Sequence, residues 1–330
     1  FPYTTLFRSP GWFWHKEGDW TRSALDPWTK VYGMDAGNPN LAVVGGWMGG
    51  ALPGIYLYDL EAEKVKQKLV DHPTLDINRF TRAVYASQPK AIVGFQFDGV
   101  VPRSFWTHAT LNTHQGKVDE MLPGTRNRIH SWDAGFRFLL VERIVTDAPH
   151  HLVWVDTSRN EVKVVMINGG KVDAEDIGRT TLVNVENRHG HALTAFITLP
   201  RGLEPRNLPL IVLMRDEPWN SIDRSEWNPR AHYLSSQGFA VLRINARGSA
   251  GQLGELNVTM ESPASVRLMF EDIEDAVAEL ASNGIVDPGR VGIAGAQQGG
   301  WAAALAPTVS SGAYHAVAAV NGLYDLQRYR

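Results

Sequence analysis

The sequence predicts an α/β fold in which antiparallel β-structure precedes a mostly parallel sheet that is covered by helices on both faces. Before about residue 180, short apolar runs alternate with polar turns, which is typical of β-hairpins. After about residue 190, strand-like apolar runs alternate with helical segments, which is typical of a parallel sheet. A chain of 330 residues is long enough for about two domains.

The first half contains two similar hairpin signals. Residues 55–58 and 152–155 are apolar, and each run is followed by an aspartate, a polar turn and another apolar strand. The aspartates, Asp59 and Asp156, are 97 positions apart. This separation fits two periods of about 40–50 residues, the repeat length of β-propeller blades. We therefore predict propeller blades over residues 10–180, with an antiparallel sheet of no particular class as the alternative. We expect residues 1–9 to be a truncated or non-native start.

The second half is predicted to form an α/β domain over residues 181–330. Strands are expected at 192–199, 208–214, 239–244, 290–294 and 316–320, and helices at 231–237, 265–283 and 301–305. The helix over 265–283 has apolar residues at helical spacing along one face. Gly238 and Gly284 stand where helices commonly end.

A glycine-flanked turn stands between the strand at 290–294 and the helix that follows it. Its sequence is Gly295-Ala296-Gln297-Gln298-Gly299-Gly300. A strand, a tight turn with glycines on both sides and a helix are the context of the Gly-x-Ser-x-Gly nucleophile elbow of α/β-hydrolases. The central residue of such a turn has a strained backbone conformation. Glycine is needed on both sides of it, because side chains there would clash with neighbouring elements. The central residue here is Gln297 instead of a serine.

Several further segments carry a resemblance to a known family. They are 208–213 (Leu-Pro-Leu-Ile-Val-Leu), 233–242, 245–251 (Asn-Ala-Arg-Gly-Ser-Ala-Gly), 271–273, 286–291 and 321–326. Together they resemble the catalytic domain of the prolyl-oligopeptidase family of serine peptidases, closest to its dipeptidyl-peptidase and acylaminoacyl-peptidase branches. The resemblance implies an α/β-hydrolase domain, incomplete in this chain, that follows propeller blades. It also implies a peptidase that admits short peptides between the two parts.

This chain differs from the family at the elements that carry out catalysis. The family's nucleophile position holds Gln297, and a carboxamide cannot form an acyl-enzyme. The family's His-Gly-Gly-Pro loop lies over the oxyanion site, and here it reads Arg215-Asp216-Glu217-Pro218, so that acids replace its two glycines. The amide of Gln298 remains as the family's backbone oxyanion donor. The family's catalytic Asp and His lie further downstream than Arg330.

Three interpretations of Gln297 follow, and the changed loop favours the first. The first is a catalytically impaired relative that binds peptides or serves as a scaffold or oligomer partner, with the propeller as one place for such binding. The second is an active serine peptidase whose gene encodes serine here and completes the triad beyond Arg330. The third is a hydrolase with another nucleophile, for which Ser249 in the turn Arg247-Gly248-Ser249 is the candidate. A structural turn hydroxyl is the alternative for Ser249.

The charged residues around this loop have two interpretations. These residues are Arg215, Asp216, Glu217, Asp223 and Arg224. They form either a solvated loop or a binding site for a peptide terminus that uses paired charges.

Composition excludes several other classes. A net charge of −3 without a basic stripe argues against nucleic-acid binding, and no apolar run is long enough to span a membrane. The lack of cysteine excludes disulfides and thiolate metal sites. No metal or cofactor is expected, because His150-His151 and His189-x-His191 have no carboxylate at a supporting helical spacing. The expected partner is a short peptide, a homo-oligomer stays open, and the expected compartment is the cytoplasm or the periplasm.

Overall fold

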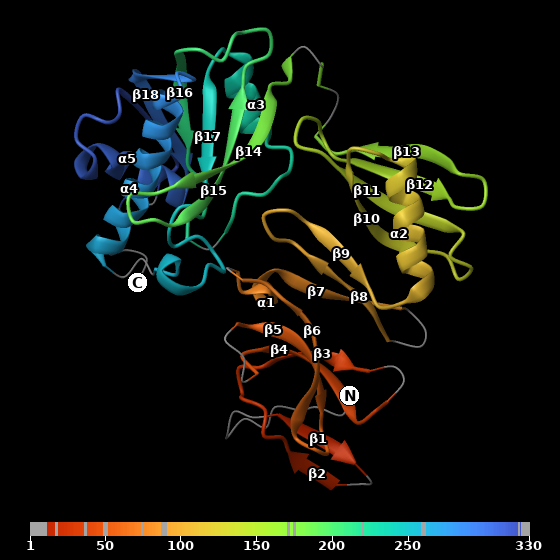
Figure 1. Ribbon diagram of the computed structural model, residues 1–330. Coiled ribbons are helices and arrows are strands. Elements are labelled where there is room, and N and C mark those ends of the chain that lie inside the picture. Colours follow the sequence, from red (N-terminus) through yellow and green to blue (C-terminus); the bar gives the residue numbers. More distant parts are fainter. Residues whose placement is uncertain are drawn as a thin grey trace. The chain divides into compact units, whose positions relative to one another are not determined.

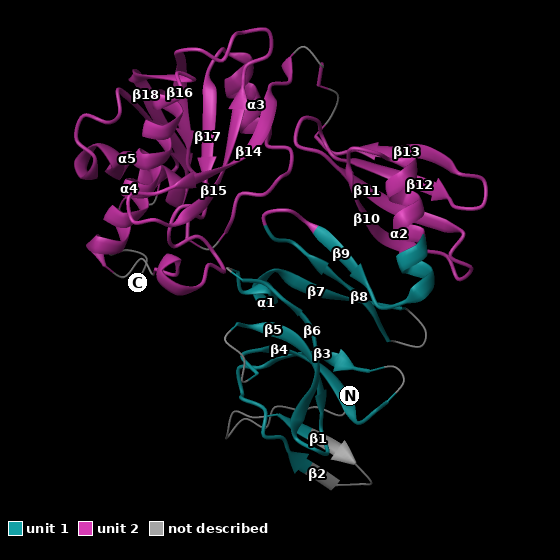
Figure 2. Cartoon of the chain, in the orientation of Figure 1, with its two compact units in different colours: residues 1–99, 103–113 teal, residues 100–102, 114–330 magenta. Residues whose placement is uncertain are grey.

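The computed structural model describes residues 12–16, 19–35, 38–48, 52–73, 75–86, 91–169, 172–173, 176–219, 221–258, 262–322 and 324. The predicted non-native start at residues 1–9 lies outside these residues. The chain divides into two compact units, residues 1–99 with 103–113 and residues 100–102 with 114–330 (Figure 2). The second unit contains two separate sheets, and the predicted domain boundary at residue 180 remains a prediction.

The first unit is built from antiparallel strands joined by short connections (Figure 1). Its strands are β1 (Phe13–Lys16) and β2 (Asp19–Arg22) in a hairpin, β3 (Lys30–Met34), β4 (Leu41–Gly46), β5 (Gly54–Asp59) and β6 (Lys64–Asp71) in a four-stranded sheet, and β7 (Thr81–Tyr85), β8 (Ile92–Phe97) and β9 (Arg103–Trp106) in a third sheet, with the short helix α1 (Ile77–Phe80) before β7. The neighbouring residues Val43 and Val44 of β4 are buried in two different apolar clusters. This strand is therefore covered on both faces, which explains its continuous apolar sequence.

The second unit begins its antiparallel part after the helix α2 (Ala109–Met121), which spans the division between the units. This part is a four-stranded sheet of β10 (Arg126–Trp132), β11 (Phe138–Ile144), β12 (His151–Asp156) and β13 (Glu161–Ile167), paired in chain order. Sheets of four antiparallel strands in chain order are the units of β-propellers.

The repeat predicted from Asp59 and Asp156 is present as one turn used twice. Asp59 ends β5, and its carboxylate accepts backbone N–H groups two and three residues further on. Asp156 ends β12, and its carboxylate accepts the corresponding two N–H groups. The last turn residue has a positive φ in both cases, 49° at Glu63 and 55° at Asn160. Each aspartate therefore closes the turn between the third and fourth strands of its sheet.

The α/β part of the second unit is a six-stranded sheet in the order β14-β15-β17-β16-β18-β19. Its strands are β14 (Arg179–Glu186), β15 (Ala192–Leu199), β16 (Leu208–Leu213), β17 (Ala240–Ile244), β18 (Val286–Ala296) and β19 (Ala316–Val320). β14, β15 and β17 pair antiparallel, and the remaining three junctions are parallel. The strands predicted from the sequence are confirmed, and β14 is an addition to them.

Helices cover both faces of this sheet (Figure 1). α4 (Pro263–Ser282) and α5 (Gln298–Val309) share an apolar cluster with Val212 and Leu242. α3 (Pro229–Ser236) packs with the adjacent residues Leu213 and Val241. Because successive strand residues point to opposite faces, α3 covers the face that α4 and α5 leave open. None of the described helices is both long enough and apolar enough to cross a membrane.

Candidate functional site

The turn between β18 and α5 has the strained geometry of a nucleophile elbow, with glutamine at its apex. Gln297 has φ 54° and ψ −124°, in the positive-φ region that residues other than glycine rarely adopt. Its N–H donates to the carbonyl of Val320 at 3.0 Å, and its carbonyl accepts from Trp301 in the first turn of α5 at 3.1 Å. The side chain is exposed. The turn therefore presents a carboxamide at the position where α/β-hydrolases present a hydroxyl.

The predicted elbow glycines are all sites of close backbone approach. A Cβ at Gly295 would overlap the backbone of Gly299, and a Cβ at Gly299 would overlap the carbonyl oxygen of Arg215. A Cβ at Gly300 would lie 2.8 Å from the carbonyl oxygen of Val320. Only glycine fits these positions without a movement of the main chain. The strand, the helix and the loop after β16 are therefore held together at the elbow.

In the loop after β16, the Arg215 side chain turns inward and is only 12% exposed. One terminal nitrogen donates to Asp223 at 2.9 Å and the other donates to the carbonyl of Pro218 at 2.8 Å. Further acceptors are the carbonyl of Ile244, the amide oxygen of Asn245 and the hydroxyl of Ser249. The guanidinium thus fixes the loop from within.

Asp223 joins the half-buried Arg215 and the buried Arg243 into one cluster. Its second carboxylate oxygen accepts from Arg243 at 2.9 Å, and Arg243 and Asp223 are 4% and 6% exposed. Arg243 also lies over the ring of Phe196, 5.0 Å from the ring centre. The interpretation of a solvated loop is therefore wrong for Arg215 and Asp223, because their side chains are only 12% and 6% exposed and pair with each other. We call Arg215, Asp223 and Arg243 the buried cluster.

The two acids of the loop have different environments. Asp216 accepts two hydrogen bonds of 2.7 Å from the guanidinium of Arg230, and these bonds raise the pKa of Arg230. The carbonyl of Asp216 accepts the N–H of Gly299 at 3.3 Å. The side chain of Glu217 is exposed and has no hydrogen bond or ion pair among the described residues. Only one acid is therefore neutralised locally.

Ser249 and Arg247 are held by structural contacts. The Ser249 hydroxyl is buried, donates to the carbonyl of Ala246 at 2.6 Å and accepts from Arg215 at 2.8 Å. Arg247 makes a buried ion pair with Asp272 at 2.8 Å. Gly248 has φ 83°, which glycine adopts without strain. These contacts are those of a satisfied turn.

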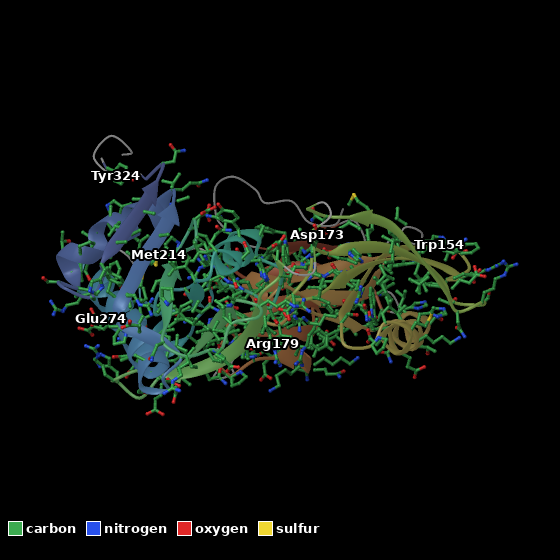
Figure 3. The ribbon with its side chains drawn as sticks, turned by 90° about the horizontal axis from the view of Figure 1, so that it is seen from above. Trp154, Asp173, Arg179, Met214, Glu274 and Tyr324 are labelled. Carbon is green, nitrogen blue, oxygen red and sulfur yellow. The ribbon has the colours of Figure 1, made fainter. Side chains whose placement is uncertain are left out.

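A cavity of about 370 Å³ lies beside the elbow. Its walls are residues of β16, of the loop after it, of the start of α3 and of β17, together with Gln297. The apolar part is Leu213 and Met214; the latter is labelled in Figure 3. The volume lies within the range of small-molecule sites. Five of the cavity's residues are predicted from the sequence, namely Arg215, Asp216, Glu217, Asp223 and Gln297, whereas Arg230 and Arg243 are not. In the sequence of β17, the only signal for Arg243 is that a charged residue stands between apolar ones.

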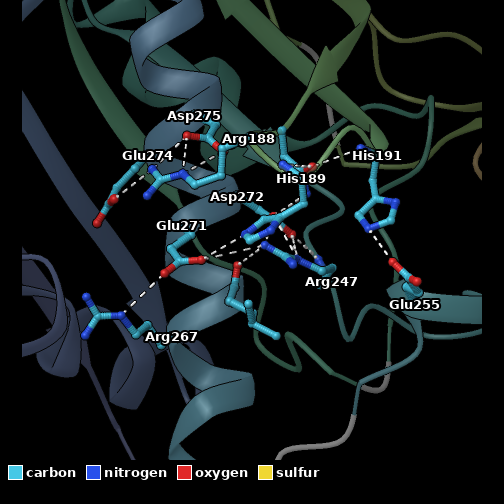
Figure 4. Close-up of polar contacts among 12 residues, drawn as sticks. Arg188, His189, His191, Arg247, Glu255, Arg267, Glu271, Asp272, Glu274 and Asp275 are labelled. Carbon is cyan, nitrogen blue, oxygen red and sulfur yellow. Dashed lines mark hydrogen bonds and ion pairs between the residues drawn. The ribbon is translucent and has the colours of Figure 1, made fainter.

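The histidines of the β14–β15 hairpin contact carboxylates (Figure 4). His189 contacts Glu271 of α4 at 3.2 Å, and His191 contacts Glu255 at 3.1 Å. Although burial alone would raise it, the pKa of Glu271 is held below its usual value by hydrogen bonds with His189 and Arg267. Arg188 adds a two-pronged ion pair with Asp275. No group of three or more metal-ligating side chains in the described part of the chain is arranged to hold a metal ion.

Comparisons with known proteins agree with this geometry. Residues 225–330 match the model of the prolyl oligopeptidase family. The chain is similar to dipeptidyl aminopeptidase BIII of Pseudoxanthomonas mexicana, with 28% identity over 139 residues, or 40% of this chain and 20% of that protein.

Solved structures resemble the fold over nearly the whole chain. A post-proline cleaving enzyme from Rickettsia typhi has a TM-score of 0.64 at 14% identity, covering 97% of this chain and 47% of that one. A puromycin-hydrolyzing peptidase from Mycobacterium tuberculosis has a TM-score of 0.64 at 17% identity, covering 97% and 52%. The chain thus spans about half the length of these structures.

The predicted fold class, an α/β-hydrolase sheet preceded by sheets of propeller type, is confirmed by these likenesses. The comparisons also confirm the predicted resemblance to the prolyl oligopeptidase family. The match to the model of that family lies in residues 225–330.

Proposed function

We propose that this protein is a catalytically impaired relative of the prolyl-oligopeptidase peptidases that binds short peptides without cleaving them at the elbow. The observation that carries the proposal is Gln297, a carboxamide on an elbow whose backbone is kept. A carboxamide has no hydroxyl that could attack a carbonyl carbon. In a well-studied protease, loss of the serine alone lowers turnover by about a millionfold.

The loop after β16 supports the same proposal. The family places the oxyanion site under this loop, where backbone N–H groups stabilise the developing charge. In this chain the carbonyl groups of Arg215 and Asp216 approach the elbow, and the carboxylate of Glu217 lines the same cavity. Carbonyl and carboxylate oxygens repel an oxyanion. The N–H of Gln298, the first residue of α5, is the one donor that the family pattern leaves.

An active serine peptidase is the second candidate, and the retained strain at position 297 favours it. A positive φ at the apex is costly, and it is the conformation that a nucleophilic serine needs. If the gene encodes serine at this position, the backbone conformation already suits a serine nucleophile.

Labelling with a fluorophosphonate probe tests the proposal on the whole protein encoded by the source gene. We expect no labelling of the natural protein and none of Gln297→Ala. Gln297→Ser is the matched variant, because it places a hydroxyl on the same backbone. It shows how much of the remaining machinery is intact.

Two results would contradict the proposal. One is labelling of the natural protein that Gln297→Ala abolishes or leaves unchanged, because both outcomes require a working nucleophile. The other is a serine codon at position 297 in the source gene. Competition between a fluorescent peptide and unlabelled peptides measures the peptide binding separately.

A further inference from the structure

The fourth strands of the two four-stranded sheets carry different side chains. β6 and β13 each follow the same aspartate turn, and each is the last strand of its sheet (Figure 1). No other strand that the structure describes pairs with the outer edge of either. An unpaired strand edge presents its N–H and C=O groups to any further strand.

The edge of β6 is protected by charge. Lys64, Lys66 and Lys68 are exposed along it. Lysines on an edge strand oppose pairing, because a further strand would have to desolvate them. β6 therefore has the side chains of an edge that stays unpaired.

The edge of β13 lacks this protection. All seven of its residues are exposed, and Val164, Val165 and Met166 are each more than half exposed. Among the described strands, no other exposes more than two large apolar side chains. The amine of Lys163 lies 5.5 Å from the ring centre of Trp154 in the neighbouring strand β12. This lysine thus extends over the sheet and does not guard its edge.

The charge pattern of β13 permits antiparallel pairing with a second copy of itself. The register that pairs all seven residues is centred on Val164. It places Glu161 opposite Ile167 of the other copy. Lys163 then lies opposite Val165, so that no like charges face each other.

The same pairing is unfavourable for β6. A register centred on Gln67 places Lys66 opposite Lys68, and one centred on Lys68 places that lysine opposite its own copy. Like charges directly opposite each other destabilise a strand pair. Both strands have a register shift against their inner neighbour, so a β-bulge does not distinguish the two edges. The side chains do, and they favour pairing at β13 alone.

We propose that β13 is a dimerisation edge, at which two copies of this chain pair antiparallel and join two four-stranded sheets into one of eight strands. The main chain supplies hydrogen bonds across the junction, and the exposed valines pack against their counterparts. The contact is the same on both copies, so the assembly closes as a dimer. Its outer edges are then the two β10 strands.

Single cysteines test this in the full chain, which has no cysteine of its own. Val164→Cys would place two thiols directly opposite each other at the two-fold axis, within the Cα separation that a disulfide spans. Mild oxidation with diamide should then give a covalent dimer on non-reducing electrophoresis. Gln67→Cys is the matched control, because Gln67 is the exposed residue of β6 at the same distance from the turn. It should give little covalent dimer.

Sedimentation equilibrium over a range of protein concentrations measures the dimer without a cross-link. Val164→Lys should raise the dissociation constant about tenfold or more, because it places two lysines opposite each other at the axis. The exposed position makes the substitution safe for folding, which circular dichroism checks. Gln67→Lys makes the corresponding change in β6 and should leave the dissociation constant unchanged.

Four results would overturn the proposal. The first is a chain that stays monomeric at every concentration, and the second is equal cross-linking of the two cysteine variants. The third is a dissociation constant that Val164→Lys leaves unchanged, because the dimer would then use another surface. The fourth is an assembly larger than a dimer, because pairing at β13 uses that edge in both copies. None of these results depends on whether the elbow is active.

Discussion

The elbow at Gln297 and the loop at Arg215–Pro218 border the same cavity, but they differ from the family pattern in different ways. The elbow keeps its backbone and its glycines, and only the apical side chain differs. In the loop, a buried arginine and two acids stand where the family has histidine and two glycines. The elbow thus has the backbone conformation of a nucleophile elbow with a carboxamide at its apex, whereas the loop is organised around a guanidinium.

The difference has a physical cause. The elbow conformation is imposed by the approach of four backbone segments, so glycine is required there whatever the apical side chain does. The loop has no such constraint, because a side chain can replace glycine if its polar groups find partners. Arg215 donates to five acceptors, and these hydrogen bonds fix the loop in this conformation.

Gly299→Ala should produce the largest loss of stability. A small loss would contradict the claim that backbone approach requires glycine at the elbow. The added methyl group would overlap the carbonyl oxygen of Arg215, which is main chain and cannot rotate away. We expect a loss of at least about 4 kcal/mol in the free energy of unfolding, measured by urea denaturation.

Gly116→Ala is the control for this substitution. Gly116 lies inside α2 and a Cβ there meets nothing within 4 Å. Gly116→Ala should raise the free energy of unfolding by about 0.5–1 kcal/mol, since alanine is the better helix former. Equal stabilities of the two variants would show that the elbow is not tightly packed.

Arg215→Met should have the second largest effect, because it leaves buried acceptors without their donor. We expect a loss of about 3 kcal/mol in the free energy of unfolding. Arg230→Met removes a second arginine from the same cavity, but Arg230 is 52% exposed and its ion pair contributes about 1 kcal/mol or less. If both variants lost the same stability, the loop would not be organised by its buried guanidinium.

Ser249→Ala should cost less, about 1–2 kcal/mol, because the buried hydroxyl both donates and accepts one hydrogen bond. Its readout is thermal unfolding, with fluorophosphonate labelling measured in parallel. Labelling of the natural protein that disappears in this variant would establish Ser249 as a nucleophile. Loss of stability with no change in labelling is expected.

Much of the fold could be predicted because the signals were local. The helix over 263–282 has a clear apolar face, and the aspartates of the β5 and β12 turns recur with their strands. α2 was missed because only Leu111 and Val118 of its residues are nearly fully buried, too few to produce a visible period. β14 was missed because its exposed and buried residues do not alternate regularly.

The site could be predicted in part. Gly295, Gln297 and Gly299 were found because adjacent residues form the turn. Of the buried cluster, Arg215 and Asp223 were found as charges of one loop, but Arg243 was not, because it comes from β17 and meets them only in the fold. A charge in sequence is as compatible with solvent as with a buried partner, and packing decides between them.

Gln297→Gly should have the smallest effect and sharpens the comparison most. Glycine adopts φ 54° and ψ −124° freely, so the strain of the apex is relieved, while the unfolded chain gains some conformational entropy. The net result should be a gain of about 1 kcal/mol in the free energy of unfolding, since a strained residue costs about 1–3 kcal/mol. Gln298→Gly removes the same side chain one residue later, in the helix, and should instead lose up to about 1 kcal/mol. Opposite signs at neighbouring glutamines would mean that the elbow stores strain with a glutamine at its apex. A loss of stability at both positions would mean that the Gln297 side chain stabilises the turn itself.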